Sequence, residues 1–147
     1  MPSASPARVA IERILPASPA DVFRAWTEPE SLRIFMCPGS VTSALVEADV
    51  RVGGRFRIVM RDDETDIVHT GEYRVVEAPS RLVFTWQSPV TGPGGSLVTI
   101  TLSPEAGGTL LVLTHEQLPD EDVAGRHRRG WASIVEKLER HLREEAV

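Results

Sequence analysis

PDEDVAGRHRRGWASIVEKLERHLREEAV, residues 119–147, has the strongest helical periodicity in this chain of 147 residues. Asp120 can cap a helix, and the acidic residues that follow suit the positive end of the helix dipole. Apolar side chains then recur at spacings of three and four, at Trp131, Ile134, Val135, Leu138 and Leu142. The spacing predicts one long helix with a single apolar stripe, which needs a partner surface.

The preceding segments, residues 41–116, have the two-residue alternation of β-strands. In residues 55–61, Phe56, Ile58 and Met60 alternate with arginines, so one face of this strand is apolar. Further strands are expected at residues 41–48, 67–77, 81–88, 97–103 and 109–116. Their connections are short, which favours an antiparallel meander, and a sheet that curls around the terminal helix would cover its apolar stripe.

The N-terminal region adds one strand and two short helices. Residues 8–15, RVAIERIL, are apolar and branched enough for a strand. Ser18 followed by Pro19 predicts the start of one helix, and Pro29 opens a second. Residues 1–7 are expected to be a flexible arm, and residues 8–147 a single α+β domain.

Composition limits the classes of function. The net charge of -5 argues against nucleic acid as a partner. Cys37 is the only cysteine, which rules out an intramolecular disulfide and fits a reducing compartment. The sequence shows neither a membrane span nor a signal peptide, so we expect a cytoplasmic protein with no membrane partner. The Ala-, Arg- and Val-rich composition with few lysines suggests a GC-rich bacterial genome.

Four stretches resemble a known family. They are IERILPASPADVFRAWTEPE (residues 11–30), DVRVGGRF (49–56), GEYRVVEAPSRLVFTW (71–86) and LTHEQLPDEDVAGRHRRGWASIVEKLERHL (113–142). In order and spacing they resemble the SRPBCC superfamily, and more narrowly its branch similar to the activator of the heat-shock-protein-90 ATPase. The resemblance implies a helix-grip, or START-like, fold. In that fold a curved antiparallel sheet of six or seven strands grips the C-terminal helix, with a cavity between them for an apolar small molecule.

Aromatic residues, and polar residues among apolar neighbours, are the candidate ligand contacts. His69 and Tyr73 share one strand face, and His115 ends the last strand. The alternatives are that His69 lies on a solvated strand end, that Tyr73 is a core residue, and that each tryptophan only packs the core. The full candidate set is Trp26, Phe35, Phe56, Ile58, Met60, His69, Tyr73, Phe84, Trp86, His115, Trp131 and Val135.

Metal and cofactor sites are not expected. His115 and Glu116 are adjacent, so on a strand they point to opposite faces, and HEQLP lacks the second histidine of a zinc-binding HExxH helix. His127 and His141 lie about four helical turns apart, too far to share one ion. The sequence also has no phosphate-binding loop and no dinucleotide fingerprint.

No catalytic residue is assigned from the sequence. There is no glycine-flanked serine elbow, and nothing near Cys37 marks an activated thiol. Glu47, Glu72 or Glu116 would act as an acid or base only inside an apolar cavity that raises its pKa, and Glu72 is expected on the face opposite His69.

Three functions remain open. The first, which we favour, is the binding of an apolar or aromatic small molecule. The second is a cyclase- or hydrolase-like enzyme, which the polyketide cyclases of the superfamily suggest, and it needs a perturbed pKa inside the cavity. The third is a co-chaperone-like interaction domain with a chaperone partner, which would show an exposed apolar patch. A homodimer through a sheet edge or the helix surface is also open.

Overall fold

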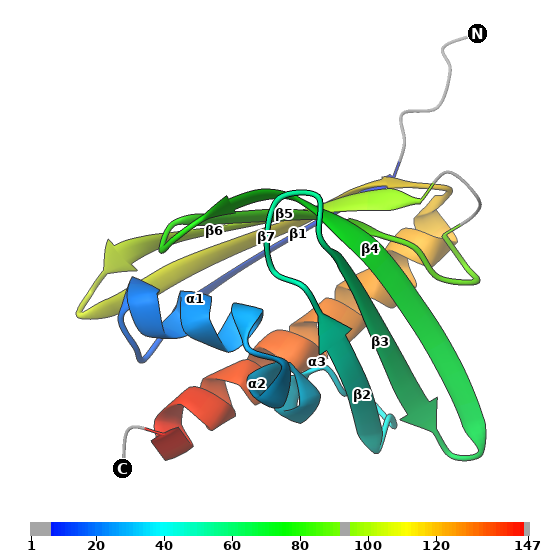
Figure 1. The fold of residues 1–147 in the computed structure, drawn as a ribbon, viewed down its shortest axis with the longest axis horizontal. Coiled ribbons are helices and arrows are strands. Elements are labelled where there is room, and N and C mark those ends of the chain that lie inside the picture. Colours follow the sequence, from blue (N-terminus) through cyan, green and yellow to red (C-terminus); the bar gives the residue numbers. More distant parts are fainter. Residues whose placement is uncertain (1–6, 92–94, 146–147) are drawn as a thin grey trace, which may run out of the picture.

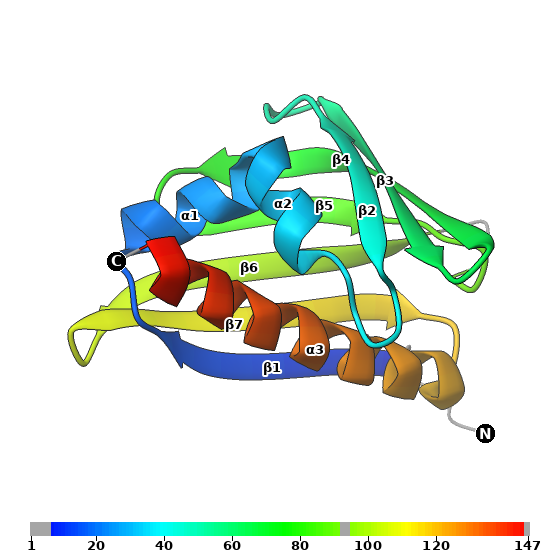
Figure 2. The same ribbon diagram turned by 90° about the horizontal axis from the view of Figure 1, so that it is seen from below.

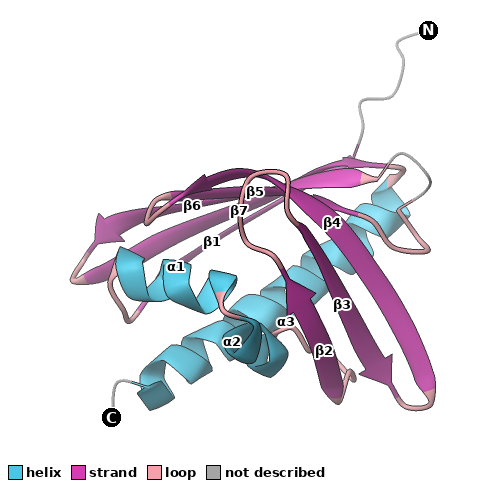
Figure 3. Ribbon diagram, in the orientation of Figure 1, coloured by secondary structure: helices cyan, strands magenta, loops and turns pink. Residues whose placement is uncertain are grey.

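The structure, a computed structural model, describes residues 7–91 and 95–145, which form a curved antiparallel sheet with helices packed on one face (Figure 1, Figure 3). In chain order the elements are β1 (Ala7–Leu15), α1 (Pro19–Thr27), α2 (Pro29–Phe35), β2 (Ser43–Ala48), β3 (Arg55–Asp62), β4 (Thr65–Glu77), β5 (Arg81–Trp86), β6 (Ser96–Glu105), β7 (Gly108–Leu118) and α3 (Glu121–Glu145). The predicted α+β helix-grip fold and its order of elements are confirmed.

The sheet is an open antiparallel meander to which the first strand is added at one edge. The strand order is β1-β7-β6-β5-β4-β3-β2, so each strand from β2 to β7 pairs with its neighbour in sequence and β1 returns beside β7. Seen from the helix side in Figure 2, α3 runs along β1 and β7, while α1 and α2 lie over the other half of the same face. The strands β2, β3 and β4 turn toward the helices, which gives the sheet its curvature (Figure 1).

The helices begin where capping residues predicted them. The Asp21 amide donates to Ser18 Oγ at 3.2 Å, and Pro19 occupies the first turn of α1. The Val123 amide donates to Asp120 Oδ1 at 2.8 Å at the start of α3. These side chains satisfy amides that have no partner within the helix. Of the predicted arm, residues 1–6 lie outside the described residues, and Ala7 already belongs to β1.

Strand β4 contains a bulge that the sequence pattern did not predict. Two-residue alternation along the strand expected at residues 67–77 predicts that Val75 shares the face of His69 and Tyr73. The pairing with β5 shifts register between Tyr73 and Val75, and Val76 packs against the core in place of Val75. The prediction for Val75 was wrong because one extra residue in a strand reverses the side-chain alternation beyond it.

Gly71 lies in β4 two residues before this bulge, where the sheet bends. A Cβ at this position would lie 1.9 Å from the Thr85 carbonyl oxygen and 2.4 Å from ring atoms of Phe56. The strand can therefore pass this close to β5 and to the Phe56 ring only because residue 71 has no side chain.

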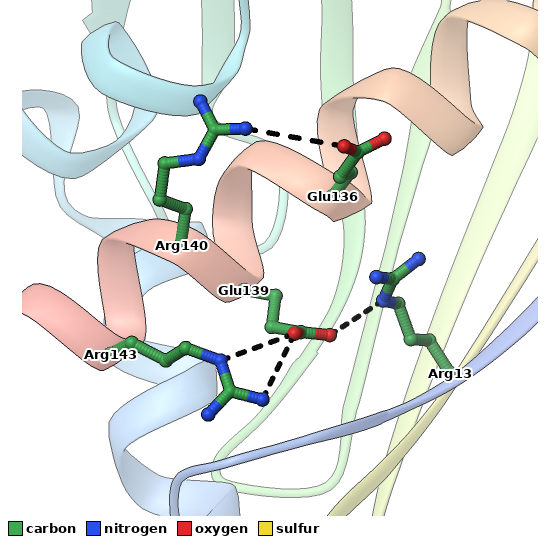
Figure 4. Close-up of polar contacts among 5 residues, drawn as sticks. All are labelled: Arg13, Glu136, Glu139, Arg140 and Arg143. Atoms are coloured by element: carbon green, nitrogen blue, oxygen red, sulfur yellow. Dashed lines mark hydrogen bonds and ion pairs between the residues drawn. The ribbon is translucent and has the colours of Figure 1, made fainter.

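The apolar stripe of α3 is buried as predicted, with Trp131, Ile134, Val135, Leu138 and Leu142 each at most 3% exposed. An ion pair also joins the helix to the sheet. Arg13 Nε of β1 donates to Glu139 Oε1 at 2.7 Å, and Arg143 holds the other carboxylate oxygen at 3.1 Å (Figure 4). A hydrogen bond from Arg13, helped by Arg143, lowers the pKa of Glu139.

Candidate functional site: a groove between β4 and α3

A groove of about 510 Å³ opens between β4, the segment after β5 and the N-terminal half of α3. Its lining includes Met60, Ile67, His69, Trp86, Trp131 and Ile134. We call it the β4–α3 groove. Small-molecule sites in proteins usually measure about 300–1,000 Å³ and are lined mainly by apolar and aromatic groups, so the size and chemistry of this groove are typical of one.

Paired hydrogen bonds hold the segment after β5 in place as the rim of the groove. Gln87 pairs with Thr70 of β4 through two backbone hydrogen bonds of 2.9 and 2.8 Å. The Thr91 hydroxyl accepts from the Ser88 amide at 2.9 Å and donates to the Ser88 carbonyl at 3.1 Å. This turn positions Ser88, Pro89 and Val90 at the rim.

Trp86 is the centre of an aromatic wall. Its ring centroid lies 4.8 Å from that of His69 and 5.0 Å from that of Trp131. Trp86 closes β5, His69 lies on β4 and Trp131 lies on α3, so the wall joins two neighbouring strands to the C-terminal helix. All three residues line the groove. Such rings offer a large apolar surface on which a planar molecule can stack.

His115 lies behind this wall in a buried chain of hydrogen bonds. Trp131 Nε1 donates to His115 Nδ1 at 2.9 Å, which leaves the imidazole proton on Nε2. Nε2 then donates to Ser96 Oγ at 2.6 Å, and Ser96 donates to the Trp86 carbonyl at 2.7 Å. Burial lowers the pKa of His115 to about 3. His115 is therefore neutral at pH 7, and both of its nitrogens are used in fixing Trp131 and the end of β5.

Two further histidines line the groove itself. His69 is 8% exposed, and burial lowers its pKa to about 4. His127 Nδ1 donates to the Val123 carbonyl at 2.9 Å within α3, and burial also lowers the pKa of this ring. The groove thus has two neutral imidazoles at pH 7 and only a few charged side chains, Asp66 and Arg126 among them.

Three buried polar atoms on groove residues have no hydrogen-bond partner within the described part of the chain. They are His69 Nδ1, Trp86 Nε1 and Ser88 Oγ. Buried polar atoms in folded proteins are nearly always paired, so three such atoms around one groove call for an explanation.

The structure separates the twelve predicted ligand contacts into groups. Met60, His69, Trp86 and Trp131 line the groove. Trp26, Phe56, Ile58, Tyr73 and Phe84 meet Trp86 at the centre of the fold, where the remaining space is about 10 Å³, roughly the room of one water. Phe35 and Val135 are buried in the core, and His115 lies behind Trp131. Ligand contact at these positions stays a prediction.

Four rim residues of the groove were not among the predicted ligand contacts: Ser88, Pro89, Val90 and Arg126. They lie in a loop or on the exposed side of a helix, where apolar periodicity gives no signal. His127 was weighed only as a metal ligand, although its position one turn before Trp131 could have indicated the same face. An added Cβ at Gly130 would meet only Pro38, at 3.9 Å, so no close approach of helix and strand requires a glycine here. Gly130 borders the groove instead.

The described residues contain neither a metal-binding cluster nor a helix suited to cross a membrane. No group of three or more His, Cys, Asp and Glu side chains is placed to hold a metal ion within residues 7–91 and 95–145. In the same residues, no helix has the length and apolar character needed to cross a bilayer.

Comparison with known proteins identifies the family. A family model described as activator of Hsp90 ATPase homolog 1-like protein matches residues 16–143. The chain belongs to this family. The match confirms the predicted branch of the SRPBCC superfamily. No curated protein matches the chain.

Solved structures of relatives share the fold. An uncharacterized protein from Rhizobium leguminosarum is 30% identical, with 97% of each chain covered and a TM-score of 0.75. Protein CV1439 from Chromobacterium violaceum is 25% identical over 90% of this chain and 94% of its own, with a TM-score of 0.80. DynU16, from the dynemicin biosynthetic locus, is 24% identical over 92% of this chain and 47% of its own, with a TM-score of 0.75. At that identity DynU16 shows a common fold alone.

Proposed function

We propose that the protein binds an apolar or aromatic small molecule in the β4–α3 groove. The observation that carries the proposal is the aromatic wall of His69, Trp86 and Trp131 beside about 510 Å³ of open space. The centre of the helix grip, by contrast, is filled to within about 10 Å³. A ligand would thus lie at the side of the grip, against the N-terminal half of α3.

A second hollow, of about 730 Å³, suits an apolar ligand less well. It lies over β2, β3 and β4, and its lining includes Glu47, Asp49, Arg55, Arg57 and Glu72. Glu72 thus lies away from His69, as strand alternation predicted. Burying these charged groups under an apolar molecule would carry a large desolvation cost.

A protein-interaction role is the alternative that the family description suggests. Large exposed apolar side chains would be its mark, and those in the structure are Ile14, Ile34, Leu45, Val52 and Val90. They come from five different segments of the chain: β1, α2, β2, the β2–β3 connection and the rim of the groove. This distribution supports the small-molecule proposal over a chaperone partner.

An enzymatic use of the groove is a second candidate, supported by His69. The imidazole of this residue lines the groove and is neutral at pH 7. A pKa of about 4 makes it a weak base at pH 7. If mass spectrometry shows that a bound compound is released unchanged, the result supports binding without catalysis. A changed product would support the cyclase-like alternative.

Two glycines of α3 allow a sharp test of the binding site. Gly130 lines the groove, whereas Gly125 does not. A Gly130→Leu side chain would fill part of the groove, and Gly125→Leu is the matched control on the same helix. Melting temperatures are measured with a panel of apolar and aromatic compounds, since a ligand that binds only the folded state raises the melting temperature.

The expected result is stabilisation of the wild type and of Gly125→Leu by at least one compound, and no stabilisation of Gly130→Leu. The proposal fails if no compound raises the melting temperature of the wild type. It also fails if Gly130→Leu responds as strongly as the control, because the ligand would then bind elsewhere.

A further inference from the structure

We propose that His127 is the polar anchor of the β4–α3 groove. Its Nε2 accepts a hydrogen bond from the ligand, so the groove prefers aromatic molecules that carry a neutral donor such as a ring hydroxyl. This inference rests on the proposed binding function and specifies the ligand chemistry of the same groove. It assigns a role to a groove residue that is not part of the aromatic wall.

The first step concerns the tautomer of His127. Its Nδ1 lies 2.9 Å from the Val123 carbonyl oxygen, one turn earlier in α3. A carbonyl oxygen can only accept, so Nδ1 carries the imidazole proton. Burial lowers the pKa of this ring, which keeps it neutral at pH 7. Nε2 therefore has a lone pair and can accept a hydrogen bond but not donate one.

The second step concerns access to this lone pair. Within residues 7–91 and 95–145, the hydrogen bond of His127 is the one to Val123. The side chain is half-buried and lines the groove, and its Nε2 is not among the polar atoms that are both buried and unpartnered. By contrast, His69 Nδ1 is closed to solvent and His115 uses both of its nitrogens. The acceptor that a ligand can reach is thus on His127.

The third step places this acceptor beside the aromatic wall. His127 precedes Trp131 by one helical turn, so both side chains lie on the same face of α3. The rings of His127 and His115 meet edge to face, with centroids 4.9 Å apart. This contact and the hydrogen bond to Val123 orient the imidazole. The acceptor therefore lies at the α3 side of the groove, next to the rings on which an aromatic ligand would stack.

The charges of the groove favour a neutral donor on the ligand. Arg126 also lines the groove, and its positive charge disfavours a cationic amine. The acidic residue of the lining, Asp66, already has Arg61 as an ion-pair partner at 3.4 Å. A hydroxyl is neutral and can donate one hydrogen bond, which a neutral imidazole nitrogen accepts.

Three probes of similar size isolate the donated hydrogen bond. The hydroxyl of 1-naphthol can donate, whereas 1-methoxynaphthalene and 1-methylnaphthalene have no donor. Affinities are measured by isothermal titration calorimetry with the wild type, His127→Asn and His127→Gln. The Asn amide can take the place of Nδ1 and keep the bond to Val123, but it has no atom at the position of Nε2. The longer Gln amide reaches that position, where its oxygen can accept.

The wild type and His127→Gln should prefer 1-naphthol to 1-methoxynaphthalene by about fivefold. His127→Asn should lose this preference. All three proteins should bind 1-methylnaphthalene with similar affinity, because this compound makes no hydrogen bond. Equal affinity of the wild type for 1-naphthol and 1-methoxynaphthalene overturns the inference and leaves the binding function standing. A preference that persists in His127→Asn also overturns it.

Diethyl pyrocarbonate gives a readout that needs no variant. This reagent acylates unprotonated imidazole nitrogens that solvent can reach, and peptide mass spectrometry identifies the labelled histidine. His127 should react before His69 and His115, and at equal saturation 1-naphthol should protect it more than 1-methylnaphthalene does. Labelling of His69 or His115 before His127 overturns the inference whether or not a probe binds. If none of the probes binds and no compound of the thermal panel does either, both the inference and the proposed function fail.

Discussion

At the scale of single residues, the buried His115 uses both of its ring nitrogens to hold neighbouring elements in place. Its Nδ1 accepts from Trp131 and its Nε2 donates to Ser96, so neither nitrogen is left for another partner. The residue positions two walls of the groove at once, because Trp131 is on α3 and Ser96 holds the Trp86 carbonyl at the end of β5.

Replacing His115 should therefore cost stability. In His115→Leu, the Trp131 N–H loses its acceptor and Ser96 Oγ loses its donor, both in a buried setting. We expect the free energy of unfolding to fall by about 2–3 kcal/mol, as measured by urea denaturation. His127→Gln is the control, because among the described residues His127 forms its hydrogen bond within its own helix, to Val123, and it should cost less than about 1 kcal/mol. If His115→Leu and His127→Gln lower the free energy of unfolding equally, the hydrogen bonds that link Trp131, His115 and Ser96 do not have the proposed stabilising role.

At the scale of elements, two glycines with opposite surroundings test the bend of β4. In Gly71→Ala the new Cβ would lie 1.9 Å from the Thr85 carbonyl oxygen, so β4 and β5 must move apart. We expect a loss of about 2 kcal/mol or more in the free energy of unfolding. In Gly125→Ala the nearest atom is the tip of Arg129, at 3.7 Å. That change should stabilise α3 by about 0.5–1 kcal/mol. A neutral Gly71→Ala would show that the bend is not required.

The link between β1 and α3 gives a second prediction at this scale. Glu139 joins Arg13 at 2.7 Å with its side chain only 20% exposed, whereas Glu136 reaches Arg140 at 4.0 Å on the exposed side (Figure 4). Glu139→Gln should lower the free energy of unfolding by about 0.5–1 kcal/mol, and less in 1 M salt. Glu136→Gln should change the free energy of unfolding by less. A larger change at Glu136 than at Glu139 would contradict the role of Glu139 as the link between α3 and β1.

The elements also show what the sequence could and could not predict. Capping residues and the apolar stripe of α3 are local signals, and both were confirmed at Ser18, Asp120 and Trp131. The bulge that turns Val75 away from the core was not predictable, because it depends on how β4 pairs with β5. Four of the twelve predicted contacts line the groove, since the sequence showed which residues are apolar but not how tightly the centre packs.

At the scale of the whole molecule, Trp86 joins the packed centre to the open groove. Its ring lies 5.9 Å from that of Phe56 on one side and 4.8 Å from that of His69 on the other. Trp86 lines both the packed centre and the groove, so the packing of the centre also fixes part of the groove lining. Burial keeps His69 in the wall and His115 behind it neutral, so the stability of the molecule depends on pH.

The direction of this dependence follows from the folded-state pKa values. Burial lowers the pKa of His69 to about 4 and that of His115 to about 3, against about 6.5 in an unfolded chain. Between those values the unfolded chain takes up protons that the folded protein does not, so stability is full above about pH 6.5 and falls as the pH is lowered. Each of the two histidines should lower the free energy of unfolding by about 2 kcal/mol between pH 7.5 and 5.0.

Urea denaturation at these two pH values tests the prediction, with His69→Phe as the comparison. The variant keeps a ring beside Trp86 but has no imidazole to protonate. The carboxylates contribute equally in both proteins. The free energy of unfolding should therefore fall less in the variant between pH 7.5 and 5.0, by the roughly 2 kcal/mol that His69 contributes. If both proteins lose the same free energy, then His69 takes up its proton as readily in the folded protein as in the unfolded chain. The wall would then be open to water in the folded protein.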